Sequence, residues 1–247
     1  MGRPLQGDAG AGSRSRAYAL GSLERHRHVI EQILPGGIAI AEAFEDPPGL
    51  VPHPSEEALI GRAVEKRRRE FVTTRNLART AMGKLGVPAA PVMRGERGAP
   101  LWPKGVVGSL AHCEGYRGAV LAYSMQVRSL GIDAEPHGPL PDGVLPAVSI
   151  EDERTWLGEQ AGDGPVHWDR ILFCAKEATY KAWFPLTQRW LGFEDAHITF
   201  ESESDTSGTF RSKLLVPGET TSGAPLTEFD GRWMVSDGLI LTAISVQ

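Results

Sequence analysis

Residues 173–183 read FCAKEATYKAW, and this stretch decides the fold of the second half of the chain. Apolar side chains recur around it at helical spacing, at Ile171, Ala175, Ala178 and Ala182. This periodicity predicts an amphipathic helix. Glu177 and Lys181 lie four residues apart on one face of that helix, with Lys176 and Tyr180 in the adjacent row.

The Glu177–Lys181 pair has two interpretations. The first is a solvated surface pair that stabilises the helix by about 0.2–0.5 kcal/mol. The second is part of a functional site. A pair of acids upstream, Asp133 and Glu135, together with phosphate-binding side chains nearby, favours the second interpretation.

The composition is that of an ordinary globular protein. The 247 residues are 41% hydrophobic and 23% charged, which is sufficient for a full core and for two modest subdomains. Lys and Arg number 26 and Asp and Glu number 31, so the net charge is −5. This balance argues against a general nucleic-acid-binding protein.

Cysteine usage favours a cytoplasmic location. The two cysteines, Cys113 and Cys174, match no metal-binding spacing and are too few for a disulfide framework. A reducing cytosol fits this usage. Residues 1–16 lack the apolar core of a secretory signal. No stretch approaches the roughly 18 apolar residues of a membrane span, so none is expected.

Composition divides the chain into three segments. We expect a flexible N-terminal extension at 1–20, an N-terminal subdomain at 21–136 and a C-terminal subdomain at 137–247. Helical pattern runs from an N-cap at Ser55 to about Leu85, with a break near Thr73 and Thr74 and a stop at Gly86. Strands are expected at 37–44, 105–110, 116–124, 130–136, 198–200, 209–216 and 232–246, and further helices at 150–160 and 167–185.

Basic residues gather within and after the first helical region. They lie at 66–69, Arg75, Arg79, Arg94 and Arg97. One interpretation is a solvated basic face. The other is a surface for a phosphorylated ligand, because the guanidinium fork of arginine matches phosphate oxygens two at a time. The strand at 105–110 delivers His112 to a loop edge, where a lone histidine is more often structural than functional.

Asp133 and Glu135 lie two residues apart in the short strand at 130–136. Both therefore project to one side of the strand, while Ile132 and Ala134 project to the other. Two carboxylates on a stiff element suit Mg²⁺, which prefers carboxylates, phosphate and water as ligands. The alternative is a pair of solvated acids at the end of a strand.

In their order along the chain, these segments resemble the signature of the 4′-phosphopantetheinyl transferases. The sequences GIDAE at 131–135 and KEATYK at 176–181 are similar to the two acidic motifs of that family. Four further segments are similar to other motifs of the family: 66–71, 98–103, 108–112 and 168–173. The likeness is to the larger, pseudo-dimeric group, and within it to the actinobacterial branch that serves mycolate-type lipid and siderophore synthesis.

The resemblance implies an α+β fold of two similar halves related by a pseudo-two-fold axis, with coenzyme A bound between them. It implies transfer of phosphopantetheine from coenzyme A to a serine of apo acyl and peptidyl carrier domains, with release of adenosine 3′,5′-bisphosphate. The carriers would belong to polyketide, fatty or mycolic acid and non-ribosomal peptide synthases. A cytoplasmic monomer that binds no nucleic acid is expected.

The resemblance also assigns roles to residues. Asp133, Glu135 and Glu177 would hold Mg²⁺, or Mn²⁺, which accepts the same oxygen ligands. Coenzyme A would be contacted by Arg67, Arg75, Arg94, Arg97, His112, Lys176 and Lys181. The catalytic set would be Glu177 as general base, Lys181 as stabiliser of the transferring phosphoryl group, and Asp133. Ala111 stands where many relatives have Ser or Thr, so a hydroxyl contact is lost there.

Two other functions use the same residues. The first is a Mg²⁺-dependent phosphohydrolase of coenzyme A-like nucleotides, with water as the nucleophile. The second is a non-enzymatic module that binds coenzyme A and releases it unaltered. Neither explains the ordered set of motifs.

Overall fold

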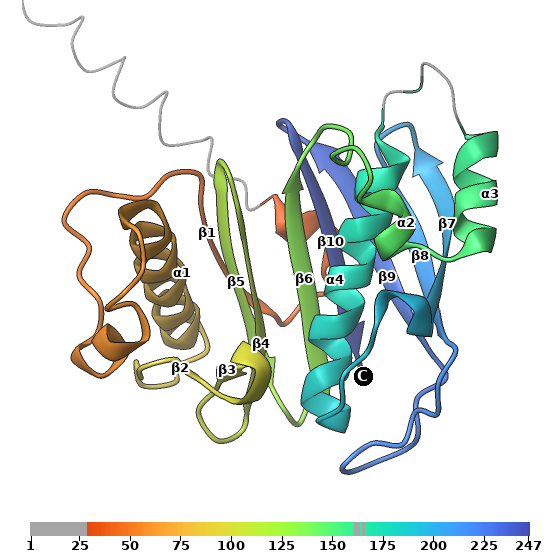
Figure 1. Ribbon diagram of the computed structural model, residues 1–247. Coiled ribbons are helices and arrows are strands. Elements are labelled where there is room, and N and C mark those ends of the chain that lie inside the picture. The colour runs from red at the N-terminus through yellow and green to blue at the C-terminus, as the bar shows by residue number, and fades with distance from the viewer. Residues whose placement is uncertain (1–28, 161–163, 165) are drawn as a thin grey trace, which may run out of the picture.

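The computed structural model describes residues 29–160, 164 and 166–247 (Figure 1). The extension expected at 1–20 lies outside the described residues. The first half contains η1 (Ile30–Ile33), β1 (Ala39–Ala43), η2 (Pro54–Leu59), α1 (Glu65–Lys84), β2 (Met93–Arg94), η3 (Glu96–Gly98), β3 (Pro100–Leu101), β4 (Val106–Cys113) and β5 (Tyr116–Tyr123). The second contains β6 (Ser129–Pro136), α2 (Leu145–Val148), α3 (Glu151–Glu159), α4 (Trp168–Thr187), η4 (Phe193–Asp195), β7 (Ala196–Ser204), β8 (Ser207–Leu214), β9 (Glu228–Ser236) and β10 (Leu239–Val246).

Two antiparallel sheets form the framework of the protein. The first has the strand order β1-β5-β4 and the second β6-β10-β9-β8-β7. Helix α1 packs against the first sheet and α4 against the second, and Figure 1 shows the two sheets side by side with these helices on them. Each half thus places a 20-residue helix on an antiparallel sheet. This arrangement confirms the α+β fold of two similar halves.

Strand β6 joins the two sheets. It pairs with β10 along its whole length, and it also lies against β4, where the backbone N–H of Ile132 donates to Ser109 Oγ at 3.0 Å. Strand β6 thus belongs to the second sheet, and the division of the chain after residue 136 stays a prediction.

Strand β6 has the alternation that its sequence predicted. Ile132 and Ala134 are fully buried in one apolar cluster. Asp133 and Glu135 instead find their ion-pair partners on α4, at Lys181 and Arg170. Both acids therefore face the helix that carries Glu177.

Helix α4 approaches β6 closely because residue 131 is a glycine. The apolar positions of α4 are buried, which confirms the amphipathic helix: Ile171, Ala175, Ala178 and Ala182. A Cβ on Gly131 would lie 2.1 Å from the carbonyl oxygen of Ala178, well inside van der Waals contact. Ser129 Oγ also donates to the carbonyl oxygen of Ala182 at 2.8 Å. The distance between the two elements that carry the acids is thus set by a missing side chain.

The break in the first helical region is not where the sequence predicted it. Helix α1 runs without interruption through Thr73 and Thr74, because the Thr74 hydroxyl donates to the carbonyl oxygen of Glu70 at 2.6 Å inside the helix. The break falls instead at 60–64, and the N-cap is His53 rather than Ser55. The predicted stop at Gly86 is present, with φ of 73°.

Two other predictions need adjustment. His112 and Ala111 lie within β4 rather than at a loop edge, since β4 extends to Cys113. The segment 232–246 forms parts of two strands, β9 and β10, joined by a turn at Asp237 and Gly238 with φ of 51° and 76°. In the described part of the chain, no helix is both long and apolar enough to cross a membrane.

We expect Gly131→Ala to lower the free energy of unfolding by about 1–3 kcal/mol, because the added methyl group forces α4 away from β6. Urea denaturation measures the change. The matched control is Gly83→Ala in α1, where a Cβ would meet nothing within 4 Å. That substitution should leave stability unchanged or raise it by up to about 1 kcal/mol. Equal stability of the Gly131 variant and the wild type would contradict the close-approach argument.

Candidate functional site

Three carboxylates from two elements gather between β6 and α4. Asp133 and Glu135 come from β6 and Glu177 from α4. Burial raises the pKa of Glu177 above its usual range, and the negative charges of Asp133 and Glu135 raise it further against the opposing effect of Lys181. Burial and the charge of Asp133 likewise raise the pKa of Glu135. The structure therefore brings the three predicted acids within electrostatic reach of one another.

Two cations hold the acids of β6. Lys181 Nζ lies 2.7 Å from Asp133 Oδ1 and also donates to the carbonyl oxygens of Leu110 and Ile132, at 3.2 Å and 3.0 Å. Burial acts to lower the pKa of Lys181, but the carboxylate of Asp133 raises it above its usual value. Arg170 Nη1 lies 2.8 Å from Glu135 Oε2. Sequence reasoning did not single out Arg170, although it lies in the segment 168–173 that carried the resemblance.

The acids have the donor chemistry for a divalent cation, although they do not form a closed metal site. Asp133 Oδ2 is buried and has no hydrogen-bond partner. From the described residues, no hydrogen bond or salt bridge reaches the Glu177 carboxylate. A buried, unpartnered carboxylate oxygen fits a hard cation such as Mg²⁺. As they stand, however, no three His, Cys, Asp or Glu side chains of the described residues are arranged to hold a metal ion.

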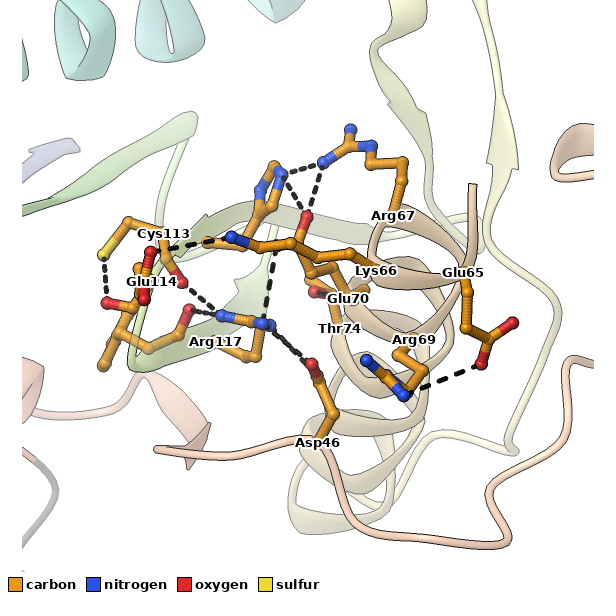
Figure 2. A network of polar contacts seen from close by, with 12 residues as sticks. Asp46, Glu65, Lys66, Arg67, Arg69, Glu70, Thr74, Cys113, Glu114 and Arg117 are labelled. Carbon is orange, nitrogen blue, oxygen red and sulfur yellow. Dashed lines mark hydrogen bonds and ion pairs between the residues drawn. The ribbon is translucent and has the colours of Figure 1, made fainter. Parts of the chain in front are cut away.

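A second cluster surrounds His112. Arg67 Nη1 contacts His112 Nε2 and lies 3.4 Å from Glu70 Oε2 (Figure 2). Because arginine only donates, His112 Nε2 accepts, and the imidazole is neutral. Burial and the positive charges of Arg67 and Lys181 lower the pKa of His112 to about 3, so the ring carries no charge at neutral pH.

A buried set of ion pairs lies beside this cluster. Arg117 is held by both oxygens of Asp46, at 3.1 Å and 2.8 Å, and lies 3.6 Å from Glu70 Oε1 (Figure 2). Arg117 is 5% exposed and Glu70 is 9% exposed, so these charges are shielded from water. These ion pairs connect the loop after β1 to α1 and β5. No local pattern in the sequence indicates them, because their members are far apart along the chain.

Arg75 and Arg94 share the ring of Phe71. Their guanidinium carbons lie 3.8 Å and 5.4 Å from its centroid. Burial, together with the charges of Arg94 and Arg67, lowers the pKa of Arg75 to about 10, so it remains charged at neutral pH. Arg75 Nε is buried without a partner. Among the predicted basic residues, Arg75 is therefore buried and stacked, whereas the others are mostly exposed: Lys66, Arg67, Arg69, Arg94 and Arg97.

Arg97 reaches the second half of the molecule. Its guanidinium carbon lies 5.3 Å from the centroid of the Trp190 ring, which also contacts Tyr180 at 5.0 Å. Beneath these rings lies a cavity of about 140 Å³ that is lined by Glu177, Tyr180, Trp190 and Leu191 among others. This cavity was not predicted, since it depends on the path of the chain after α4.

Lys176 does not lie with the other predicted coenzyme A ligands. Its side chain is 2% exposed, and Nζ pairs with Glu153 Oε2 at 2.9 Å and donates to the carbonyl oxygens of Phe193 and Ala196 at 2.6 Å each. Burial lowers its pKa, against the opposing effect of Glu153. All three N–H donors are thus used inside the protein. The helical motif predicted the position of Lys176, but its partner Glu153 comes from α3.

The sequence matches known proteins over most of its length. Residues 55–122 match the 4′-phosphopantetheinyl transferase N-terminal domain, and residues 129–222 match the 4′-phosphopantetheinyl transferase superfamily. The chain is 59% identical to 4′-phosphopantetheinyl transferase Npt of Nocardia iowensis, over 88% of this chain and 99% of that protein. It is 57% identical to 4′-phosphopantetheinyl transferase PptT of Mycobacterium tuberculosis, over 87% and 97%. It is 29% identical to enterobactin synthase component D of Salmonella typhimurium, over 79% and 77%.

We expect Lys176→Ala to lower the free energy of unfolding by about 3–5 kcal/mol, because it leaves the buried charge of Glu153 without its cation. Lys104→Ala, at an exposed lysine, should change it by no more than about 0.5 kcal/mol. Urea denaturation distinguishes the two. A loss below about 1 kcal/mol for the Lys176 variant would contradict the structural role of the pair.

Proposed function

The chain belongs to the 4′-phosphopantetheinyl transferases, and from this premise we propose how its residues perform the transfer. It is a transferase that moves phosphopantetheine from coenzyme A to carrier proteins. The family uses coenzyme A as its substrate and depends on a divalent metal. The proposals that follow concern the residues of this chain that act, the carriers and the metal.

Asp133, Glu135 and Glu177 would hold Mg²⁺ beside the pyrophosphate of coenzyme A. The observation that supports this most directly is the buried, unpartnered Oδ2 of Asp133, whose negative charge raises the pKa of both other acids. The ion supplies charge neutralisation for the phosphoryl group and its leaving group. Mn²⁺ could replace it, because both ions accept oxygen ligands.

Glu177 is the general base for the carrier serine. A serine hydroxyl attacks the phosphorus that bears the pantetheine, the bond to adenosine 3′,5′-bisphosphate breaks, and the hydroxyl proton passes to Glu177 directly or through one water. A carboxylate whose pKa is raised by burial and by neighbouring acids is a stronger base than an exposed one. Lys181, which lies one turn further along α4, stabilises the negative charge of the transferring group.

Coenzyme A is bound by the basic residues of the first half. These contacts are made by Arg67, Arg75, Arg94, Arg97 and His112, together with Lys181. The charges of Arg67, Arg94 and Lys181 each act on the pKa of Arg75 or His112, so these five groups lie within electrostatic reach of one another, whereas Arg97 lies over Trp190. Neutral His112 acts as a hydrogen-bond donor through its other nitrogen. Lys176 is not part of this set, because its three donors are used within the protein.

The protein acts as a cytoplasmic monomer on apo acyl and peptidyl carrier domains. The carriers proposed are those of polyketide, fatty or mycolic acid and non-ribosomal peptide synthases, and a relative named as a component of enterobactin synthase supports the last of these. The cytoplasm is proposed because two cysteines, Cys113 and Cys174, are too few for the disulfide framework of a small secreted protein. No role with nucleic acid is proposed, given the net charge of −5.

We expect Asp133→Ala and Glu177→Ala each to lower the rate of transfer by about 10²–10³-fold or more, with circular dichroism unchanged. The assay is intact-protein mass spectrometry of an apo carrier protein mixed with the enzyme, coenzyme A and Mg²⁺, in which the carrier gains one phosphopantetheine group. Asp142→Ala, at an exposed acid, is the control. Near-normal transfer by either variant would remove that residue from the site. Breakdown of coenzyme A without a carrier would indicate the phosphohydrolase instead, and intact coenzyme A with an unmodified carrier would indicate the binding module.

We expect Arg67→Ala to raise the KM for coenzyme A about tenfold or more with little change in kcat, because it removes a charge-assisted contact to phosphate. Arg69→Ala is the matched control, since Arg69 lies two residues away on α1 and pairs only loosely with Glu65, at 3.9 Å (Figure 2). An unchanged KM for coenzyme A with a raised KM for the carrier would mean that Arg67 belongs to the surface that binds the carrier protein.

A further inference from the structure

The two acids of β6 are held in the same way. Asp133 has one oxygen on Lys181, at 2.7 Å, and its other oxygen is buried without a partner. Glu135 has one oxygen, Oε2, on Arg170, at 2.8 Å. From the described residues, no hydrogen bond reaches its Oε1. Each carboxylate thus presents one occupied and one free oxygen.

Arg170 is itself fixed in place. Besides Glu135, its guanidinium donates to the carbonyl oxygen of Pro139 at 2.5 Å and to that of Gly138 at 3.4 Å. The side chain is only 18% exposed. The neighbouring Asp169 accepts the backbone N–H of Leu140 at 2.8 Å, which fastens the same loop to the start of α4. With three acceptors around it, Arg170 is not free to swing toward a substrate phosphate.

The spacing along α4 explains why one helix serves all these groups. Arg170, Glu177 and Lys181 lie at i, i+7 and i+11, which places them on one face of the helix, two turns and then one turn apart. That face packs on β6. The helix therefore delivers a cation to each strand acid and, between the two cations, the third acid.

We propose that Arg170 is a positioning residue, which holds Glu135 through Oε2 so that Oε1 remains available to the divalent metal. The proposal rests on the metal site proposed above. A carboxylate fixed by a second residue loses less conformational entropy on binding a metal and is kept in its charged form. The positive charge of Arg170 also offsets the repulsion that three neighbouring acids would otherwise experience.

Mn²⁺ binding, measured by electron paramagnetic resonance with coenzyme A present and no carrier protein, tests the proposal without turnover. We expect Arg170→Gln to weaken Mn²⁺ binding about 10–100-fold. Arg170→Lys keeps the charge but cannot reach Glu135, Gly138 and Pro139 together, and should give an intermediate loss. Arg189→Gln is the matched control, because Arg189 also contacts carbonyl oxygens and a glutamate, Glu219, away from the acids. It should bind Mn²⁺ as the wild type does.

Two outcomes overturn the proposal, and one of them also overturns the metal site. If Arg170→Gln, or Arg170→Lys should the glutamine variant fail to fold, binds Mn²⁺ as tightly as the wild type or more tightly, Arg170 does not position Glu135 for the metal. Tighter binding of Mn²⁺ by the variant would mean that Arg170 competes with the ion for Glu135. Asp133→Asn separates the two ideas. If this variant keeps wild-type Mn²⁺ affinity, the metal assignment itself is wrong; if it loses binding while the Arg170 variants do not, only the role of Arg170 fails.

Discussion

The site depends on the ammonium group of Lys181. This group donates three hydrogen bonds: to the carbonyl oxygen of Leu110 in β4, to that of Ile132 in β6 and to the carboxylate of Asp133. One side chain of α4 thus ties both sheets together where the chemistry takes place. Lys181 can reach these acceptors because α4 lies directly on β6 at Gly131. If α4 lay further from β6, Lys181 would lose these contacts, which connect the helix to both sheets.

The fold keeps a high density of charge stable by pairing it. Asp133, Glu135 and Glu70 each lie within 4 Å of a lysine or arginine nitrogen, and these partners come from elements distant in sequence. Buried carboxylates need such partners, because desolvation penalises the charged form. Glu177 differs, since among the described residues no salt bridge reaches it, while burial raises its pKa as it raises that of Glu135. The acid left unpaired is the one on which the proposed proton transfer depends.

Local patterns predicted the elements well and the partners poorly. The 3.6-residue periodicity found α4, the alternation in β6 oriented Asp133, and Gly86 marked the end of α1. Lys176 and Lys181 belong to the same motif, yet one is consumed by Glu153 from α3 while the other joins the acids, a distinction that only tertiary packing makes. Arg170 was invisible as a site residue for the same reason. The turn at Asp237 and Gly238 was missed although an Asp-Gly pair is a strong hairpin signal.

The strand order has a consequence for how the protein folds. Strand β10 ends at Val246 and lies between β6 and β9, which do not pair with each other. It also completes the apolar cluster that contains Ile30 and Ile33. Strand β6 lies at the edge of the second sheet and pairs there with β10, while the whole segment 137–238 lies between these two strands along the chain. Pairing between strands so far apart in sequence is slow, because a long loop must close before any contact forms, so the acidic strand is expected to take its final place late in folding.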